Sequence, residues 1–135
     1  MKKLFTFFAI LAMATSLTAQ TPKENILKDW ERACAYTKEY LDAMPESGYA
    51  LKPTKEMRSF AGQMLHIADA NYGIVGTATE VAPTAKDLEK SNDVTKAGVT
   101  EKVLASYDFA INAIKNYPDA KWAEMIKLFN RFDVT

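Results

Sequence analysis

The chain has 135 residues, of which 48% are hydrophobic and 25% are charged, a composition typical of one globular domain with a modest core. Seventeen basic residues balance seventeen acidic ones, so the chain has no basic field for nucleic acid or anionic lipid, and neither partner is supported. A single cysteine excludes an internal disulfide.

The N-terminal stretch has the pattern of a secretory signal. Two lysines precede an apolar run that ends at Leu17, and the small residue Ala19 stands at the expected cleavage point. The run is shorter than the roughly 20 residues of a transmembrane helix, although an uncleaved anchor remains the alternative. We therefore predict a signal peptide over residues 1–19, a helical domain over 20–135, and export to the periplasm or the extracellular space without membrane attachment after cleavage.

A first amphipathic helix is predicted from Pro22 to about Met44. Thr21 can cap it, and Glu24 completes a capping box. Cys34 lies on its apolar side, so we interpret it as a core residue, the alternative being a reactive thiol. The apolar stripe repeats at three and four residues: Ile26, Leu27, Trp30, Ala33, Cys34, Thr37, Tyr40, Leu41 and Met44. Tyr49 and Leu51, in the link that follows, are expected to fold back over one end of the helices.

The second predicted helix holds the only histidine of the chain, His66. Pro53 cannot extend a preceding helix, so this helix begins near Thr54 or Ser59. Its core-facing stripe is Met57, Phe60, Ala61, Met64, Leu65, Ile67, Ala68, Tyr72 and Val75. His66 falls on the opposite side in a strip of small residues that includes Gly62 and Gly73. Either this strip admits a ligand or a backbone, or His66 is a half-exposed histidine and the glycines are incidental.

The second half of the chain predicts a long connection and two further helices. Residues 80–98 are polar, and they form either the rim or lid of a cleft or a solvated loop with a helical turn near Asp87 to Lys90. A third helix is predicted from a cap at Thr100 to about Tyr117, with Val99 stapled to Leu104. After Pro118, a short helix capped by Asp119 is expected to bury Trp122, Met125, Ile126 and Phe129.

The first two helices together resemble a known family. The resemblance rests on four features: a helix that contains Trp30, a link with Lys52 and Pro53, the run Met57-Arg58-Ser59-Phe60, and the run Leu65-His66-Ile67. These residues resemble the DinB-like, YfiT-type superfamily of metal-dependent proteins, and the likeness extends less distinctively to the last residue. The resemblance implies an all-α four-helix bundle.

The resemblance also implies a divalent metal, Zn²⁺ or Ni²⁺, held by three histidines. The first is at the position of His66, and the other two belong to a final helix at HxxxH spacing. No histidine follows His66, so we expect a DinB-like bundle whose last helix is absent from this chain, a truncated rather than a divergent metal-free member. Such a chain would hold no metal stably, and it would be poorly stable alone or would associate, for instance as a homodimer. Asp69 either orients the His66 ring or is a solvated helix carboxylate.

The function expected from the resemblance is that of an exported metal-binding enzyme, either a hydrolase or a thiol S-transferase, acting on a small-molecule substrate. The metal in such a site binds and deprotonates a water or a thiol. No complete catalytic constellation is visible in the sequence; for example, Gln63 stands where a Glu-xx-His metal motif needs glutamate, so the catalytic residues are unknown. The competing hypothesis is a non-enzymatic helical binding or scaffold protein of the cell envelope.

Overall fold

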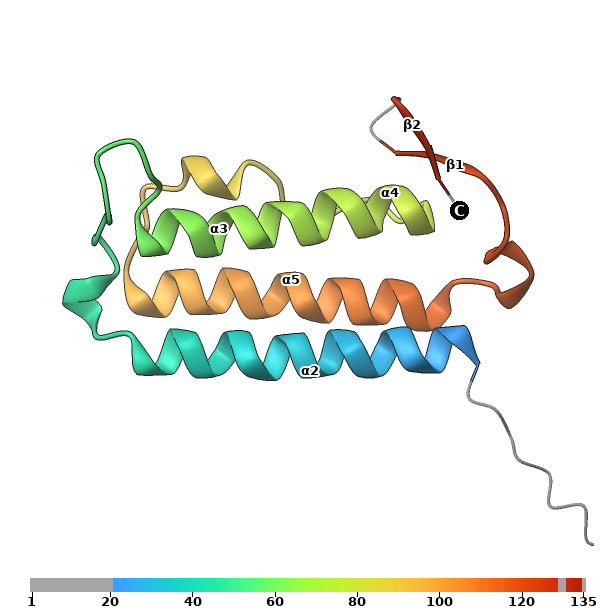
Figure 1. Ribbon diagram of the computed structural model, residues 1–135, viewed down its shortest axis with the longest axis horizontal. Helices are drawn as coiled ribbons and strands as arrows, with labels where there is room; N and C mark the ends of the chain where they lie inside the picture. The colour runs from blue at the N-terminus through green and yellow to red at the C-terminus, as the bar shows by residue number, and fades with distance from the viewer. Residues whose placement is uncertain (1–20, 129–130, 135) are drawn as a thin grey trace, which may run out of the picture.

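The computed structural model describes residues 21–128 and 131–134. The predicted signal peptide, residues 1–19, and Phe129 of the predicted last helix lie outside the described residues. Three long helical stretches run side by side, with α5 between α3 and α2, and a small hairpin stands beside α4 (Figure 1). The fold is all-α, as predicted. Among the described residues, no helix is both long and apolar enough to cross a membrane.

The first helix, α2, spans Pro22–Ala43, within one residue of the predicted end. Thr21 and Glu24 form the predicted capping box, in which the Thr21 side chain accepts from Glu24 N–H and the Glu24 carboxylate accepts from Thr21 N–H at 2.9 Å. Its predicted stripe is correct except at Tyr40, whose side chain is exposed, whereas the neighbouring Leu41 is fully buried. The stripe is therefore narrower than the sequence indicated.

The corner after α2 is held by Tyr49. Its hydroxyl donates to the Leu41 carbonyl at 2.9 Å, and its ring packs edge-on against Phe60 with 5.0 Å between centroids. A short 3-10 helix, η2 (Glu46–Gly48), precedes it. The prediction that this link covers the helix ends is correct for Tyr49 and wrong for Leu51, which is exposed.

The second stretch is α3 (Phe60–Ala70), a π-helical turn η3 (Asn71–Val75) and α4 (Gly76–Thr79). Ser59 is the cap, accepting from Gly62 N–H at 3.1 Å, so the later of the two predicted starts is correct. Met57 lies before the helix and is exposed, contrary to the predicted stripe. The π-turn brings Asn71 inward, where its amide donates to the buried Ser106 hydroxyl at 3.0 Å.

The third long helix, α5, spans Lys96–Asn116, and its cap lies five residues before the predicted cap. Thr95, not Thr100, is the cap, and it accepts from Gly98 N–H at 3.1 Å. The predicted staple is wrong because Val99 lies inside the helix and is fully buried. The reason is Asp93, which binds both the amide and the hydroxyl of Thr95 and so fixes the cap there.

The predicted final helix is also wrong. Asp119–Lys121 forms only a 3-10 turn, η5, and the chain continues as strands β1 (Ile126–Leu128) and β2 (Phe132–Val134). The strands pair antiparallel, with Ile126 opposite Val134 and Leu128 opposite Phe132. In β1 the half-buried Ile126 and Leu128 flank the exposed Lys127, which is the alternation of a strand. Because the strand has three residues, this alternation is hard to distinguish from one helical turn in the sequence.

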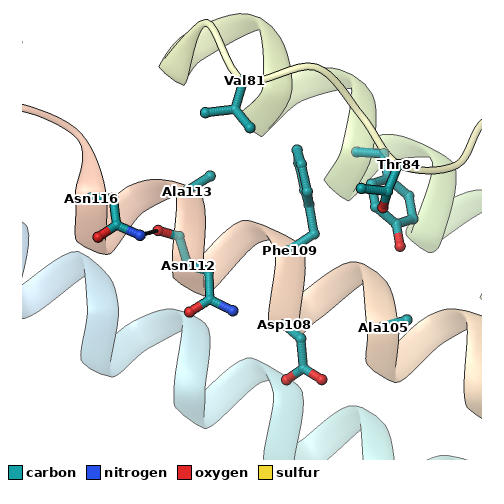
Figure 2. A pocket seen from close by; sticks show the side chains of 9 residues that line it. Val81, Thr84, Ala105, Asp108, Phe109, Asn112, Ala113 and Asn116 are labelled. Carbon is teal, nitrogen blue, oxygen red and sulfur yellow. Dashed lines mark hydrogen bonds between the residues drawn. The ribbon is translucent and has the colours of Figure 1, made fainter.

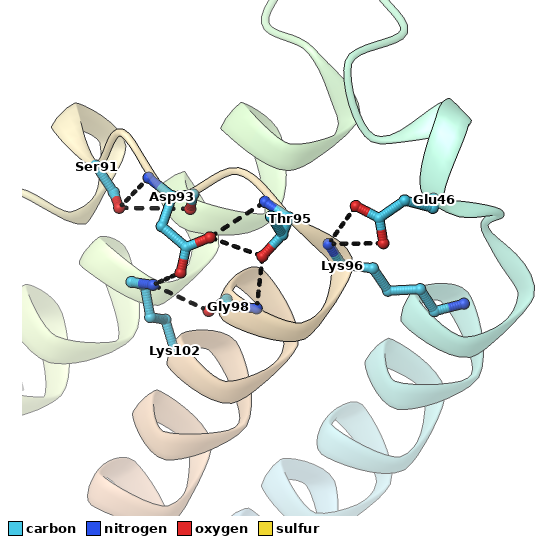
Figure 3. A network of polar contacts seen from close by, with 7 residues as sticks. All are labelled: Glu46, Ser91, Asp93, Thr95, Lys96, Gly98 and Lys102. Atoms are coloured by element: carbon cyan, nitrogen blue, oxygen red, sulfur yellow. Dashed lines mark hydrogen bonds and ion pairs between the residues drawn. The ribbon is translucent and has the colours of Figure 1, made fainter.

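A polar network holds the start of α5 to the rest of the fold (Figure 3). Asp93 accepts from the Thr95 hydroxyl at 2.7 Å and from Lys102 Nζ at 2.9 Å. Lys96 reaches back to donate to the carbonyls of Asp42 and Met44, at 2.7 and 2.8 Å, and so neutralises the C-terminal end of α2.

Gly98→Ala is expected to lower the free energy of unfolding by about 1–3 kcal/mol, although alanine is normally the better helix former. A Cβ at Gly98 would lie 1.8 Å from Asp93 Oδ2, and the partners of Asp93 hold that carboxylate in place. Urea unfolding checks this in four proteins: the parent, Gly98→Ala, Asp93→Ala and the double variant Asp93→Ala/Gly98→Ala. The Gly98 change should become harmless once Asp93 is truncated. An equal cost in both backgrounds would contradict the collision.

The stability contributed by Asp93 is expected to fall in acid. Hydrogen bonds from Thr95 and Lys102 lower the pKa of this carboxyl from 3.8 to about 2 in the folded protein. Because the folded value is the lower one, the contribution is complete above pH 3.8 and is lost as the pH falls toward 2. Unfolding free energies of the parent and Asp93→Asn, measured from pH 6 down to pH 2, should therefore converge. A gap that is unchanged by pH would contradict the assignment.

Candidate functional site

His66 lies on α3 with its side chain 42% exposed, on the face away from the core as the sequence predicted. Its ring nitrogen Nδ1 is hydrogen-bonded to Oε1 of Glu89, which belongs to the 3-10 helix η4 (Leu88–Lys90). The imidazole is thus held by a residue 23 positions further along the chain. Nε2 is the ring nitrogen left without a protein partner in the part of the chain that the structure describes.

Glu89 bridges His66 and Arg58. Arg58 Nε donates to Glu89 Oε2 at 3.0 Å, so each carboxylate oxygen has its own partner. The hydrogen bond from His66, followed by that from Arg58, holds the pKa of the Glu89 carboxyl below its usual value. Glu89 therefore remains an anion at neutral pH, and it fixes the orientation of the imidazole.

Asp69 does not contact the His66 ring, and it is more than a solvated helix carboxylate. Its carboxylate accepts the backbone amides of Leu88 and Glu89, each at 2.9 Å, instead of contacting the His66 ring or remaining solvated. The acceptance of two amides by one carboxylate is a strong arrangement, because each hydrogen bond is assisted by charge. Asp69 therefore fastens η4 onto α3, and through η4 it places Glu89 beside His66.

The small residues near His66 have local explanations. A Cβ at Gly62 would approach the Ser59 hydroxyl to 3.3 Å, and Ser59 is the cap of α3. Gly73 lies in the π-turn, where its carbonyl accepts from the Thr77 hydroxyl at 2.7 Å. The close approach at Gly62 is thus to the cap of its own helix, which favours the reading in which the glycines are incidental.

The residues present do not make a complete metal site. No group of three His, Cys, Asp or Glu side chains that could hold a metal ion occurs among residues 21–128 and 131–134. His66 is the only histidine of the sequence, and the oxygens of Asp69 and Glu89 are already engaged. What the site does contain is one imidazole whose Nδ1 faces a carboxylate and whose Nε2 has no partner among the described residues. A carboxylate on one ring nitrogen is the arrangement that orients a metal-binding histidine.

The comparisons with known proteins agree with the fold. The model of a family described as the DinB superfamily matches residues 29–134. The chain belongs to the DinB superfamily. Neither the curated proteins nor the solved structures provide a match. The superfamily match includes the whole His66 site, from Arg58 to Glu89.

Cys34 is a packing residue in this DinB superfamily protein. It is partly buried and packs against the core around Leu41 and Val103. Burial, with a smaller effect of the nearby Asp108 carboxylate, raises the pKa of the thiol. A raised pKa leaves little thiolate at neutral pH, so Cys34 lacks the electropositive setting of a reactive cysteine.

The connection after α4 has two parts with different surroundings. Val81 and Thr84 form one wall of an open cavity of about 430 Å³ above α5 (Figure 2). Phe109 projects into this cavity from α5. The ring centroids of Tyr72 and Phe109 are 4.9 Å apart. Further along, η4 forms the helical turn predicted near Asp87 to Lys90. His66 is not among the lining residues of this cavity, so the predicted rim of a metal cleft stays a prediction, whereas the predicted helical turn is present and lies at the His66 site.

Glu89 and its link to His66 were not predicted from the sequence. Arg58 appeared there only as part of the family phrase, and nothing in the spacing of the chain relates η4 to α3. Asp69, three residues after His66, was the nearer candidate for holding the imidazole. The pairing depends on how the connection folds back, which the polar composition of residues 80–98 does not determine.

Asp69→Ala is expected to lower the free energy of unfolding by about 1–2 kcal/mol, because two backbone amides lose a charged acceptor. Amide hydrogen exchange should rise selectively at Leu88 and Glu89, with little change in the middle of α5. Asp29→Ala, which removes an exposed carboxylate paired only with Arg32, is the matched control and should leave both amides protected. Unchanged exchange at Leu88 and Glu89 in Asp69→Ala would contradict the fastening role.

Proposed function

We propose that this DinB superfamily protein is exported after cleavage of residues 1–19, and that His66 is one ligand of a divalent metal, Zn²⁺ or Ni²⁺, in a metal-dependent enzyme of the hydrolase or thiol S-transferase type. The observation that supports the metal role is the His66–Glu89 pair. A carboxylate on Nδ1 fixes the ring and makes Nε2 the better ligand. Arg58 and Asp69 in turn hold Glu89, so the free nitrogen is oriented before any metal arrives.

The described residues supply one ligand of such a site, and a stable site needs three or more. We therefore derive no catalytic step from it. The proposal for this chain is limited to a single oriented imidazole, with weak binding of the free metal. A complete site would need further ligands that are not among the described residues.

A second candidate is a non-enzymatic helical binding or scaffold protein of the cell envelope. It is favoured by the incomplete ligand set and by the contacts of Glu89, which already form a hydrogen-bonded network with Arg58 and His66 without any metal. In this alternative the pair only fastens the connection to α3. The two candidates differ in what happens at Nε2, which can be measured directly.

Adding Zn²⁺ or Ni²⁺ to the mature chain should perturb Nε2 of His66 while Nδ1 keeps its proton. Because the chain has one histidine, long-range ¹H–¹⁵N spectra report these two nitrogens without assignment. Zn²⁺ is the diamagnetic probe, and Ni²⁺ should broaden the same resonances. Glu89→Gln should weaken binding about tenfold, and His66→Ala should abolish the response in calorimetry.

Asp87→Asn is the matched control, since Asp87 lies two residues from Glu89 and pairs with Lys90 and not with His66. It should bind metal like the parent. If the parent shows no change at Nε2, or if His66→Ala binds as well as the parent, the metal role is excluded and the binding or scaffold function is favoured.

A further inference from the structure

A second cavity of about 390 Å³ lies at the hairpin end of the molecule, away from His66. Its walls come from α2, the η3–α4 stretch, the end of α5 and both strands, including Ile26, Trp30, Ala78, Trp122, Leu128 and Val134. The nearest lining residue on the His66 helix is Ile74, eight residues further on, or about 12 Å along the helix axis. The two sites are therefore separate, and one does not contribute residues to the other.

The walls of this hairpin-end cavity are mainly apolar and aromatic. Trp30, Tyr117 and Trp122 all line it, and the rings of Tyr117 and Trp122 meet at 82° with 5.9 Å between centroids, forming an aromatic corner. Its volume falls within the range of about 300–1,000 Å³ typical of small-molecule sites. The shape and composition therefore suit a compact organic molecule with an apolar body.

Two carboxylates and one ammonium group lie at one corner of the cavity, where Lys121 and Glu124 are lining residues and Glu80 pairs with Lys121. Lys121 is bound to Glu80 at 2.6 Å, so its charge is already neutralised. Glu124 also lines the cavity and has no ion-pair partner in the described part of the chain. Glu124 follows Trp122 by two residues, and both line the cavity. Aromatic faces at a corner that has one more carboxylate than ammonium groups favour a cationic group.

We propose that the hairpin-end cavity binds an organic cation with an apolar or aromatic body, such as an arylalkylamine. The ammonium group lies against Glu124 and the aromatic corner of Tyr117 and Trp122. The body fills the space between α2 and the η3–α4 stretch, against Trp30 and Ala78. This site is independent of the proposed metal role of His66, and either can fail without the other.

The chain contains only two tryptophans, and both line this cavity, so their fluorescence reports its occupation. Three compounds with the same phenylbutyl body test the charge preference: 4-phenylbutylamine, butylbenzene and 4-phenylbutyrate. Excitation at the red edge of tryptophan absorption avoids the phenyl group. The amine should shift or quench the emission at the lowest concentration, and it should bind about fivefold or more tighter than the acid.

Two kinds of variant locate the site. Ala78→Leu fills the cavity and should abolish the response, whereas Ala105→Leu, which encroaches on the other cavity of Figure 2, should not. If Ala78→Leu lowers the melting temperature, Ile26→Phe fills the same space from α2. Glu124→Gln should reduce the preference of the amine over the acid severalfold, and Glu101→Gln, an exposed carboxylate of α5, should leave it unchanged.

Three results would overturn the proposal. One is no tryptophan response to any of the compounds up to their solubility limits. Another is equal affinity for the amine and the acid in the parent chain. The third is a response that survives in both cavity-filling variants. Metal binding at His66 should be the same in all of these variants, which keeps the two sites experimentally distinct.

Discussion

The apolar stripe of α5 is the constraint on which the rest of the structure depends. Val99 and Val103 are fully buried, and they form one core with Leu41 from α2 and Leu65 from α3. Burial of side chains of this size contributes about 1.5–3 kcal/mol each, more than any exposed ion pair of the fold. Since this face of α3 must meet α5, His66 on the opposite face is directed outward, where η4 can reach it.

Polar contacts between distant segments fix the positions of the connections, which the packing of the core does not determine. Tyr49 closes the corner between α2 and α3, Lys96 joins the start of α5 to the end of α2, and Asp69 holds η4 on α3. Each contact satisfies backbone groups that a helix end or a turn leaves without partners. The His66 site is a product of this arrangement, because Asp69 binds the backbone of the residue whose carboxylate reaches the imidazole.

The elements that the sequence predicted correctly are those with local signals. The capping box at Thr21 and Glu24, the breaks at Pro53 and Pro118, and the end of α5 near Tyr117 each depend on a few neighbouring residues. The errors occurred where two local choices were nearly equal. Thr95 and Thr100 are both good caps, and Asp93 decided between them through its hydrogen bonds. Three-residue strands near Ile126 have too few positions for a period of two to be recognised.

The sequence by itself determined the all-α class, the three long helical stretches and the outward direction of His66, because these follow from hydrophobic period and helix ends. It also carried the superfamily, through the residues that resemble it. Only the tertiary structure decided the partners of that histidine and the existence of the hairpin-end cavity. Glu89 is 23 residues from His66, and the cavity is lined by segments from Ile26 to Val134. Contacts between residues so far apart in the sequence depend on how the helices pack and on where the connections between them fold back. No local sequence pattern encodes these contacts.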